Sequence, residues 1–252
     1  MTEIVSHRGG AWLWPENSMI AFENTTKLDV EQVEFDVHPS RDGKLVVIHD
    51  PTLERTTSGS GRVSDHDWAD LSQLVLKGAD GGRMLLLDEV IEIFAPTAIN
   101  LRLELKVDAD GTPYPGLPER VVDTLRRTGM TERTVATSFQ LGTVIELGRA
   151  GLGDNRLWIL APKVMTDIGG IDGVLDLAEA RGITRLGIRQ DMLTEADLSK
   201  GRARGFHIGC WACNDPSVMR RMFELEVAVF TTDRPDLAIA VRNEMRKEGA
   251  AA

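Results

Sequence analysis

The sequence predicts an α/β fold, specifically a (β/α)8 TIM barrel, and two observations support this prediction. Short apolar segments rich in β-branched residues recur along the chain, and helix-length stretches with apolar residues at helical spacing lie between them. The length of 252 residues suits one such barrel without requiring a second domain. We therefore expect residues 1–252 to form a single barrel domain.

Nine segments match the strand pattern, one more than a closed barrel of this type needs. Only residues 38–44 separate the second segment from the third, and Asp42-Gly43 within them is a turn signal. A parallel crossover needs about a dozen residues or more, so this pair should form an antiparallel arm. The predicted strands lie at residues 3–7, 32–37, 45–49, 99–106, 133–138, 156–160, 184–188, 206–211 and 227–231.

Residues 51–88 interrupt the alternation of strands and helices. They carry the run Ser58-Gly59-Ser60-Gly61 and contain no clear strand–helix unit. We interpret them as a small inserted lobe or lid, with a plain surface excursion as the alternative. Residues that can cap a first helical turn indicate helix starts elsewhere, at Asn17, Thr194 and Asp215.

The acidic composition excludes several kinds of partner. The formal net charge is −10, whereas nonspecific binding to nucleic acid or anionic lipid needs a broad basic surface. We therefore expect no nucleic-acid partner, and an anionic substrate would need a locally positive pocket. The first residues lack the features of a secretory signal and no segment reaches the apolar length of a membrane span. These features predict a cytoplasmic protein without stable membrane insertion.

Cys210 and Cys213 form a C-x-x-C motif, which could be a redox pair or half of a metal site. Two cysteines cannot build a four-thiolate zinc site. We favour simple packing of Cys210 at the end of an apolar strand, because free cysteine behaves as a small buried hydrophobe.

Three acidic residues lie in two predicted strands. Glu34 and Asp36 alternate with apolar residues, so both carboxylates leave the same side of their strand. Glu104 shares one face of its strand with Arg102 and Lys106. Two purely structural interpretations are possible. Glu34 and Asp36 could face water, and Glu104 could form an internal ion pair with Arg102 or Lys106. Inside a barrel, adjacent acids need a positive partner, and three carboxylates form a hard oxygen shell suited to one divalent cation, Mg²⁺ or Ca²⁺.

Two histidines are the last residues of predicted strands, at the end of a barrel where catalytic groups are usually found. His7 ends the first strand and precedes Arg8, and His49 ends the third. A lone histidine at such a place is more often structural, but two of them beside an arginine and three acids favour catalysis. One neutral imidazole can take a proton from an attacking hydroxyl while the other, protonated, gives one to the leaving alkoxide. Arg8 and Lys106 could then contact the phosphoryl oxygens.

Seven short motifs, together with their order and spacing, resemble the glycerophosphodiester phosphodiesterase family. The closing Thr-Thr-Asp-Arg-Pro-Asp at 231–236 is similar to the C-terminal signature of that family, so the resemblance covers essentially the whole chain. The motifs are His-Arg-Gly at 7–9, Pro-Glu-Asn at 15–17, Glu-Phe-Asp-Val at 34–37, Asp-Gly at 42–43, His-Asp at 49–50, Arg-Thr-Thr at 55–57 and Glu-Leu-Lys at 104–106.

The resemblance implies a function as well as a fold. It implies a small-molecule glycerophosphodiester as substrate. It also implies a reaction in two steps: a free hydroxyl of the glycerol moiety attacks phosphorus and displaces the other alcohol, and water then opens the resulting cyclic phosphate. It also implies an apolar wall for the glycerol or the head group at Trp211, with barrel packing as the alternative. The roles that it assigns are the metal ligands Glu34, Asp36 and Glu104, the acid/base pair His7 and His49, and the phosphate contacts Arg8 and Lys106.

Departures from the family pattern bear on substrate choice more than on chemistry. His38 is unusual and should point away from Asp36, while Trp12 and Trp14 add two indoles near the predicted mouth. We expect Asp233-Arg234 to be a structural ion pair, and Glu16 to be either a support for His7 or Arg8 or an exposed acid. The lesser candidates for lining the pocket are Ser138, Phe139, Trp158 and Arg189.

Two other functions remain as alternatives. A lysophospholipase D or a phosphoinositide-cleaving phospholipase C would use a similar barrel with a membrane-contacting rim. A catalytically silent phosphodiester-binding barrel should have lost a histidine or an acid of the predicted site, and this chain retains them all. The head group and the oligomeric state have no signal in the sequence.

Overall fold

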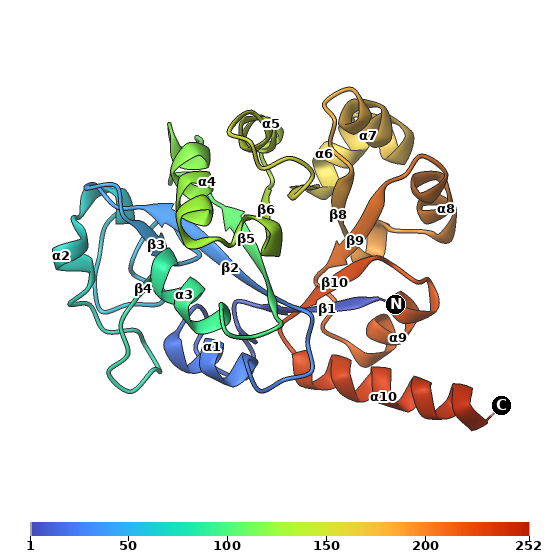
Figure 1. Ribbon diagram of the computed structural model, residues 1–252, viewed down its shortest axis with the longest axis horizontal. Coiled ribbons are helices and arrows are strands. Elements are labelled where there is room, and N and C mark those ends of the chain that lie inside the picture. The colour runs from blue at the N-terminus through green and yellow to red at the C-terminus, as the bar shows by residue number, and fades with distance from the viewer. Residues whose placement is uncertain (1, 252) are drawn as a thin grey trace.

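A ring of parallel strands surrounded by helices forms the centre of the molecule (Figure 1), as a computed structural model of residues 2–251 shows. Within these residues eight strands run parallel, and β1 closes the ring by pairing with both β2 and β10. The predicted TIM barrel is therefore confirmed. The strands of the ring are β1 Glu3–His7, β2 Gln32–Pro39, β5 Asn100–Leu105, β6 Thr134–Ser138, β7 Arg156–Ile159, β8 Arg185–Arg189, β9 His207–Trp211 and β10 Val229–Thr232.

The predicted antiparallel arm is also confirmed. The end of β2 pairs with β3, Leu45–Val47, which places Val37 opposite Val47. On its other side β3 pairs with a further short strand, β4, Leu85–Leu86. The expectation that residues 51–88 contain no strand–helix unit is wrong at their end, where β4 leads directly into a helix. Two residues are too few to show the alternation that identifies a strand in a sequence.

The inserted segment packs beside the arm and has its own apolar cluster. It contains the 3₁₀-helix η1, Val63–Asp65, and the short helix α2, Trp68–Leu71, which Figure 1 shows next to β3 and β4 at one side of the barrel. This small core is separate from the apolar core of the barrel and stabilises the folded conformation of the segment. The cluster consists of Val46, Ile48, Leu53, Val63, Leu71, Leu76 and Met84.

Helices cover the outside of the ring, and two of the three predicted caps are confirmed. Thr194 caps α8 through the backbone of Asp197, and Asp215 caps α9. The cap of α1 is Ser18 and not Asn17, which adopts a left-handed conformation with φ of 56°. The helices are α1 Met19–Thr25, α3 Leu87–Phe94, α4 Leu117–Thr128, α5 Leu141–Arg149, α6 Pro162–Asp167, α7 Gly170–Glu179, α8 Glu195–Ala203, α9 Pro216–Glu224 and α10 Pro235–Ala251, with 3₁₀ turns η2 Thr131–Arg133 and η3 Gln190–Met192. Across residues 2–251 none of them combines the length and apolar character needed to cross a bilayer.

Three aromatic rings join α1 and α3 to β2, the strand that carries two of the candidate acids. Phe22 of α1 meets Phe35 of β2 and Phe94 of α3 edge to face, with both pairs of ring centroids 5.9 Å apart. All three side chains are fully buried. This cluster anchors the outer face of β2, so that the inner face is held in place for the site.

We expect Phe22→Ala to lower the free energy of unfolding by about 3–5 kcal/mol, because it leaves a cavity between three elements. Denaturant titration would measure the change. Ile20→Ala in the same helix is the matched control, since Ile20 is 47% exposed, and it should alter stability by less than about 0.5 kcal/mol. Equal effects of the two substitutions would show that the aromatic cluster does not stabilise this region.

Candidate active site

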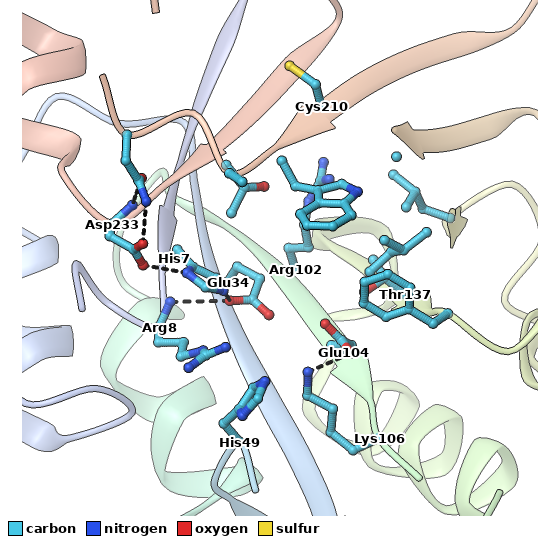
Figure 2. Close-up of a pocket in the computed structure, with 18 residues that line it drawn as sticks. His7, Arg8, Glu34, His49, Arg102, Glu104, Lys106, Thr137, Cys210 and Asp233 are labelled. Atoms are coloured by element: carbon cyan, nitrogen blue, oxygen red, sulfur yellow. Dashed lines mark hydrogen bonds and ion pairs between the residues drawn. The ribbon is translucent and has the colours of Figure 1, made fainter. Parts of the chain in front are cut away.

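A pocket of about 310 Å³ opens at the end of the barrel where the parallel strands terminate. This is the end at which TIM barrels carry their reactive groups, because successive strands bring loops and strand ends together there. Figure 2 shows that the pocket brings together residues from distant parts of the chain. Seven of the eight predicted site residues line it: His7, Arg8, Glu34, His49, Glu104, Lys106 and Trp211. The eighth, Asp36, is fully buried beside them.

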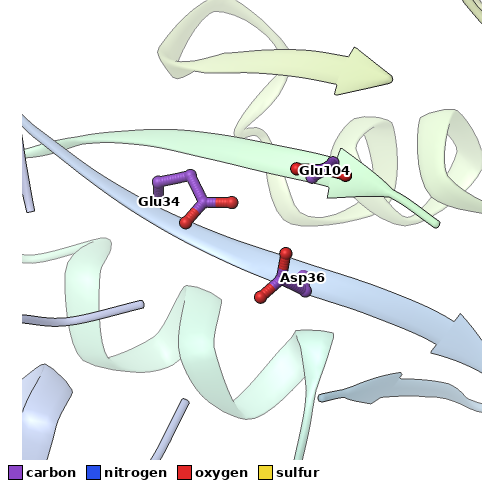
Figure 3. A group of neighbouring side chains, drawn as sticks. All are labelled: Glu34, Asp36 and Glu104. Atoms are coloured by element: carbon purple, nitrogen blue, oxygen red, sulfur yellow. The ribbon is translucent and has the colours of Figure 1, made fainter. Parts of the chain in front are cut away.

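Three carboxylates form a cluster on the inner face of two neighbouring strands. Glu34 and Asp36 lie on one face of β2, and the register of β2 with β5 places Glu104 beside Asp36. One oxygen atom of each residue lies within 4.8 Å of the others, as Figure 3 illustrates. Their exposed fractions are only 4%, 0% and 7%, in the same order. Such a cluster needs nearby positive charge, and its oxygen donors suit a hard divalent cation.

Two cations lie against the cluster. The Lys106 ammonium is 2.9 Å from Asp36 Oδ1 and 2.5 Å from Glu104 Oε1. The Arg8 guanidinium places Nε 3.2 Å from Asp36 Oδ2. Burial opposes the charge of Asp36, but Lys106 and Arg8 outweigh it and hold the pKa of this carboxyl well below its usual range. Burial and the neighbouring Asp36 carboxylate instead raise the pKa of Glu34. The alternative of an ion pair between Glu104 and Lys106 therefore coexists with a cluster that could hold a cation.

His7 is held by an acid from the other end of the chain. Its Nδ1 lies 2.5 Å from Asp233 Oδ1, although the two residues are 226 positions apart. Asn214 fixes this aspartate, since its side-chain amide donates to Asp233 Oδ2 at 2.6 Å and its carbonyl oxygen accepts from the Asp233 backbone at 2.8 Å. The other ring nitrogen, Nε2, lies 3.7 Å from Glu34 Oε2. Burial opposes protonation of His7, but Glu34 and Asp233 outweigh it and raise the pKa of the imidazole.

His49 has a matching support from its own neighbour in the sequence. Its Nδ1 lies 2.6 Å from Asp50 Oδ1, and Arg55 donates to the other oxygen of Asp50 at 2.5 Å. Arg55 also forms two hydrogen bonds with Glu16, at 2.7 and 2.8 Å. Burial, together with the charge of Lys106, lowers the pKa of His49. Both histidines thus have an aspartate at Nδ1, which orients each ring.

An aromatic pair forms part of the pocket wall. Trp211, at the end of β9, meets Phe139 edge to face with ring centroids 5.8 Å apart, and both residues line the pocket. Three lesser candidates do not line it. Trp158 is buried, with Nε1 donating to the carbonyl oxygen of Phe139, the Ser138 hydroxyl donates to a backbone oxygen, and Arg189 pairs with an aspartate.

The sequence-based expectation for Asp233 is wrong. Arg234 pairs with Asp236 at 2.7 Å, which leaves Asp233 to hold His7. The position of Asp233 just after the last barrel strand was the signal that could have identified it, because that strand ends at the same mouth as β1. Asn17 was also missed, and its side-chain amide donates to Asp36 Oδ2 at 2.9 Å.

Glu16 and His38 have defined places around the site. Glu16 is not an exposed acid, because it accepts hydrogen bonds from both Arg8 and Arg55. His38 lies outside the acidic cluster, as expected, with Nδ1 3.0 Å from the Tyr114 hydroxyl and Nε2 3.0 Å from the His49 backbone oxygen. Burial lowers the pKa of His38 to about 4, so this ring is neutral and supports the backbone of His49.

The comparison with known protein families assigns the chain that carries this pocket to a class, the phosphoric diester hydrolases. The model of the glycerophosphoryl diester phosphodiesterase family matches residues 7–237. The chain belongs to this family, and the resemblance read from its motifs is confirmed. Because the chain is an enzyme of this class, the alternative of a catalytically silent phosphodiester-binding barrel is no longer favoured.

Known relatives match nearly the whole chain. A glycerophosphodiester phosphodiesterase of Bacillus altitudinis is 29% identical over 256 residues, which cover 98% of this chain and 100% of that protein. A crystal structure from Agrobacterium tumefaciens C58, provisionally named a glycerophosphoryl diester phosphodiesterase, has 37% identity and a TM-score of 0.94, and covers 98% of this chain and 99% of that one. An Oleispira antarctica phosphodiesterase solved with its product sn-glycerol-3-phosphate shares the fold, with a TM-score of 0.78 and 22% identity over 96% and 97% of the two chains.

We expect Asp233→Asn to reduce kcat by on the order of 10–100-fold, because an amide no longer stabilises the imidazolium or selects the same tautomer of His7. Steady-state assays across pH would measure this, and the pH at which His7 titrates should fall, since the raised pKa depends partly on Asp233. Asp236→Asn removes the neighbouring ion pair with Arg234 and should leave both quantities unchanged. An unaltered pH profile in Asp233→Asn would contradict the role of this contact.

Proposed function

We propose that the protein hydrolyses a glycerophosphodiester to glycerol phosphate and an alcohol, with His7 and His49 as its acid/base pair. The observation that carries the proposal is the matched support of the two rings. Each has Nδ1 within 2.6 Å of an aspartate, and both side chains line the pocket that contains the acidic cluster. Two imidazoles that are held at Nδ1 and line one pocket suit a reaction with one proton removal and one proton donation.

Glu34, Asp36 and Glu104 are the proposed ligands of one divalent cation, Mg²⁺ or Ca²⁺. Their hard oxygen donors and mutual distances support this role. So does Asp36 Oδ1, which accepts no hydrogen bond of regular geometry although the Lys106 ammonium lies 2.9 Å away. When bound, the cation would stabilise the negative charge that develops on the phosphoryl oxygens.

The two histidines carry out all the proton transfers of the proposed reaction. A free hydroxyl of the glycerol moiety attacks phosphorus and gives its proton to Nε2 of one neutral imidazole. The bond from phosphorus to the other alcohol breaks, and that alkoxide receives a proton from Nε2 of the second, protonated imidazole. Water then opens the cyclic phosphate with the two roles exchanged, which returns both histidines to their starting states.

Arg8 and Lys106 are the proposed contacts of the phosphoryl oxygens. Both cations lie at the acidic cluster and line the pocket, so they can add donors where the charge develops. Trp211 contacts Phe139 edge to face. We propose it as an apolar wall for the glycerol or the head group.

A lysophospholipase D or a phosphoinositide-cleaving phospholipase C is the second candidate. The exposed indole of Trp12, with 63% of its surface in solvent, favours it because an aromatic rim can contact acyl chains. A substrate panel distinguishes the candidates. Glycerophosphocholine, glycerophosphoethanolamine, glycerophosphoglycerol and glycerophosphoinositol test the first proposal, and lysophosphatidylcholine and a phosphoinositide test the second.

We expect His7→Ala and His49→Ala each to lower kcat by on the order of 10²–10⁴-fold on the best substrate of that panel, because each removes one proton-transfer group. Circular dichroism would verify that both variants fold. His207→Ala is the matched control, since His207 lies exposed at the opposite end of β9 and should retain full activity. Undiminished turnover in either variant would refute the acid/base assignment.

We expect a chelator to abolish turnover, and Mg²⁺ or Ca²⁺ to restore it. The cation should also raise the Tm of the chelated protein, because it relieves repulsion within the buried cluster. Glu104→Gln should reduce this rise, whereas Glu195→Gln, on the surface helix α8, should not. A protein that is fully active in excess chelator would contradict a metal requirement.

A further inference from the structure

Arg102 is a buried cation of the pocket that the proposed reaction does not use. It lies on β5 two residues before Glu104, which places the two Cα atoms roughly 7 Å apart along the strand. Only 7% of Arg102 is exposed, yet the residue lines the pocket. In Figure 2 its side chain runs away from Glu104 and Lys106 and toward Cys210. The pocket therefore has positive charge beyond the acidic cluster, on the interior side.

This cation lacks the partners that a buried arginine normally has. Arg102 donates a hydrogen bond from Nε to Gln32 Oε1 at 3.1 Å, and no carboxylate of residues 2–251 is within ion-pair distance. Arg242, which is 3% exposed, is different, because it pairs with Glu31 at 2.6 Å and with Asp29 at 2.8 Å. A buried charge without a close ion pair is costly, and burial lowers the pKa of Arg102 to about 10 although the more distant carboxylates Glu34 and Glu3 oppose this shift. The two Nη groups of Arg102 remain for a ligand.

Two further donors of the same pocket have no partner. The hydroxyl of Thr137, a fully buried residue on β6, forms no hydrogen bond, and neither does Nε1 of Trp211. Buried hydroxyl and indole groups usually find a partner, so both are unusual. The guanidinium and the indole can only donate, and a hydroxyl can donate. Such a set is complementary to an acceptor-rich anion rather than to an ammonium head group.

We infer that Arg102, together with Thr137 and Trp211, recognises a carboxylate on the organic part of the substrate next to the phosphodiester. The inference rests on the proposed function, which places the phosphodiester at the acidic cluster. A carboxylate suits the two Nη groups of one arginine, which can bind it side by side.

Two ligands that differ at one carbon test the inference directly. Glycerol 3-phosphate and 3-phosphoglycerate carry the same phosphate, but the second has a carboxylate where the first has a hydroxymethyl group. Calorimetric titration in the presence of Mg²⁺ should show that the wild-type protein binds 3-phosphoglycerate roughly 10–100-fold more tightly. Arg102→Gln should bring the ratio of the two dissociation constants close to one. Thr137→Val, which keeps the side-chain shape, should lower the ratio by roughly 3–10-fold.

Controls keep the inference separate from the proposed function. Arg189→Gln alters an arginine that pairs with Asp191 at 2.6 Å outside the pocket, so it should leave the ratio unchanged. If Arg102→Gln does not fold, Thr137→Val and Trp211→Phe still test the site. Equal affinities in the wild type, or a ratio that survives in all folded variants, would overturn the inference. A wild-type protein that prefers the carboxylate through Arg102 but cleaves no glycerophosphodiester would refute the proposed function and retain the subsite.

Discussion

Charge balance among buried groups is the constraint on which the site depends. Glu34, Asp36 and Glu104 lie so close together that repulsion alone would protonate or displace them. Lys106 and Arg8 prevent this by ion pairs of 2.9 and 3.2 Å to Asp36, which keeps that carboxylate charged. The burial of Asp36 makes these attractions stronger than they would be in water. The three carboxylates can therefore remain close together in an arrangement that could hold a cation.

The closure of the barrel brings His7 and its support next to the cluster. Because β1 pairs with β10, His7 at one strand end meets Asp233 just after the other. Its counterpart His49 is held outside the ring, by the arm and by the network of Asp50, Arg55 and Glu16. The inserted segment thus contributes Arg55 to the rim as well as covering the arm. Two structurally different supports produce the same result, a ring fixed at Nδ1.

The polar groups of the pocket differ in the partners that they have. At the acidic cluster, acids and cations compensate one another through close ion pairs. Arg102 lies two residues before Glu104, Thr137 lies opposite Glu104 in the sheet register, and Trp211 ends β9; all three keep side-chain donors without protein partners. Unpaired donors in a cavity are usually satisfied by a ligand or water, and the carboxylate inferred above would satisfy them.

The sequence by itself determined the barrel, the arm and the composition of the reactive cluster. Strand alternation and turn signals are local, so Glu34 and Asp36 could be assigned to one face, and the spacing from His7 to Lys106 identified the family. Only the tertiary structure decided which distant groups support these residues. Asp233 holds His7 across 226 positions because the ring closes there, and its place after the last strand showed only that it lies at the mouth, not which residue it contacts. Such contacts depend on which strand ends meet in space, and that is set by the register of the whole barrel.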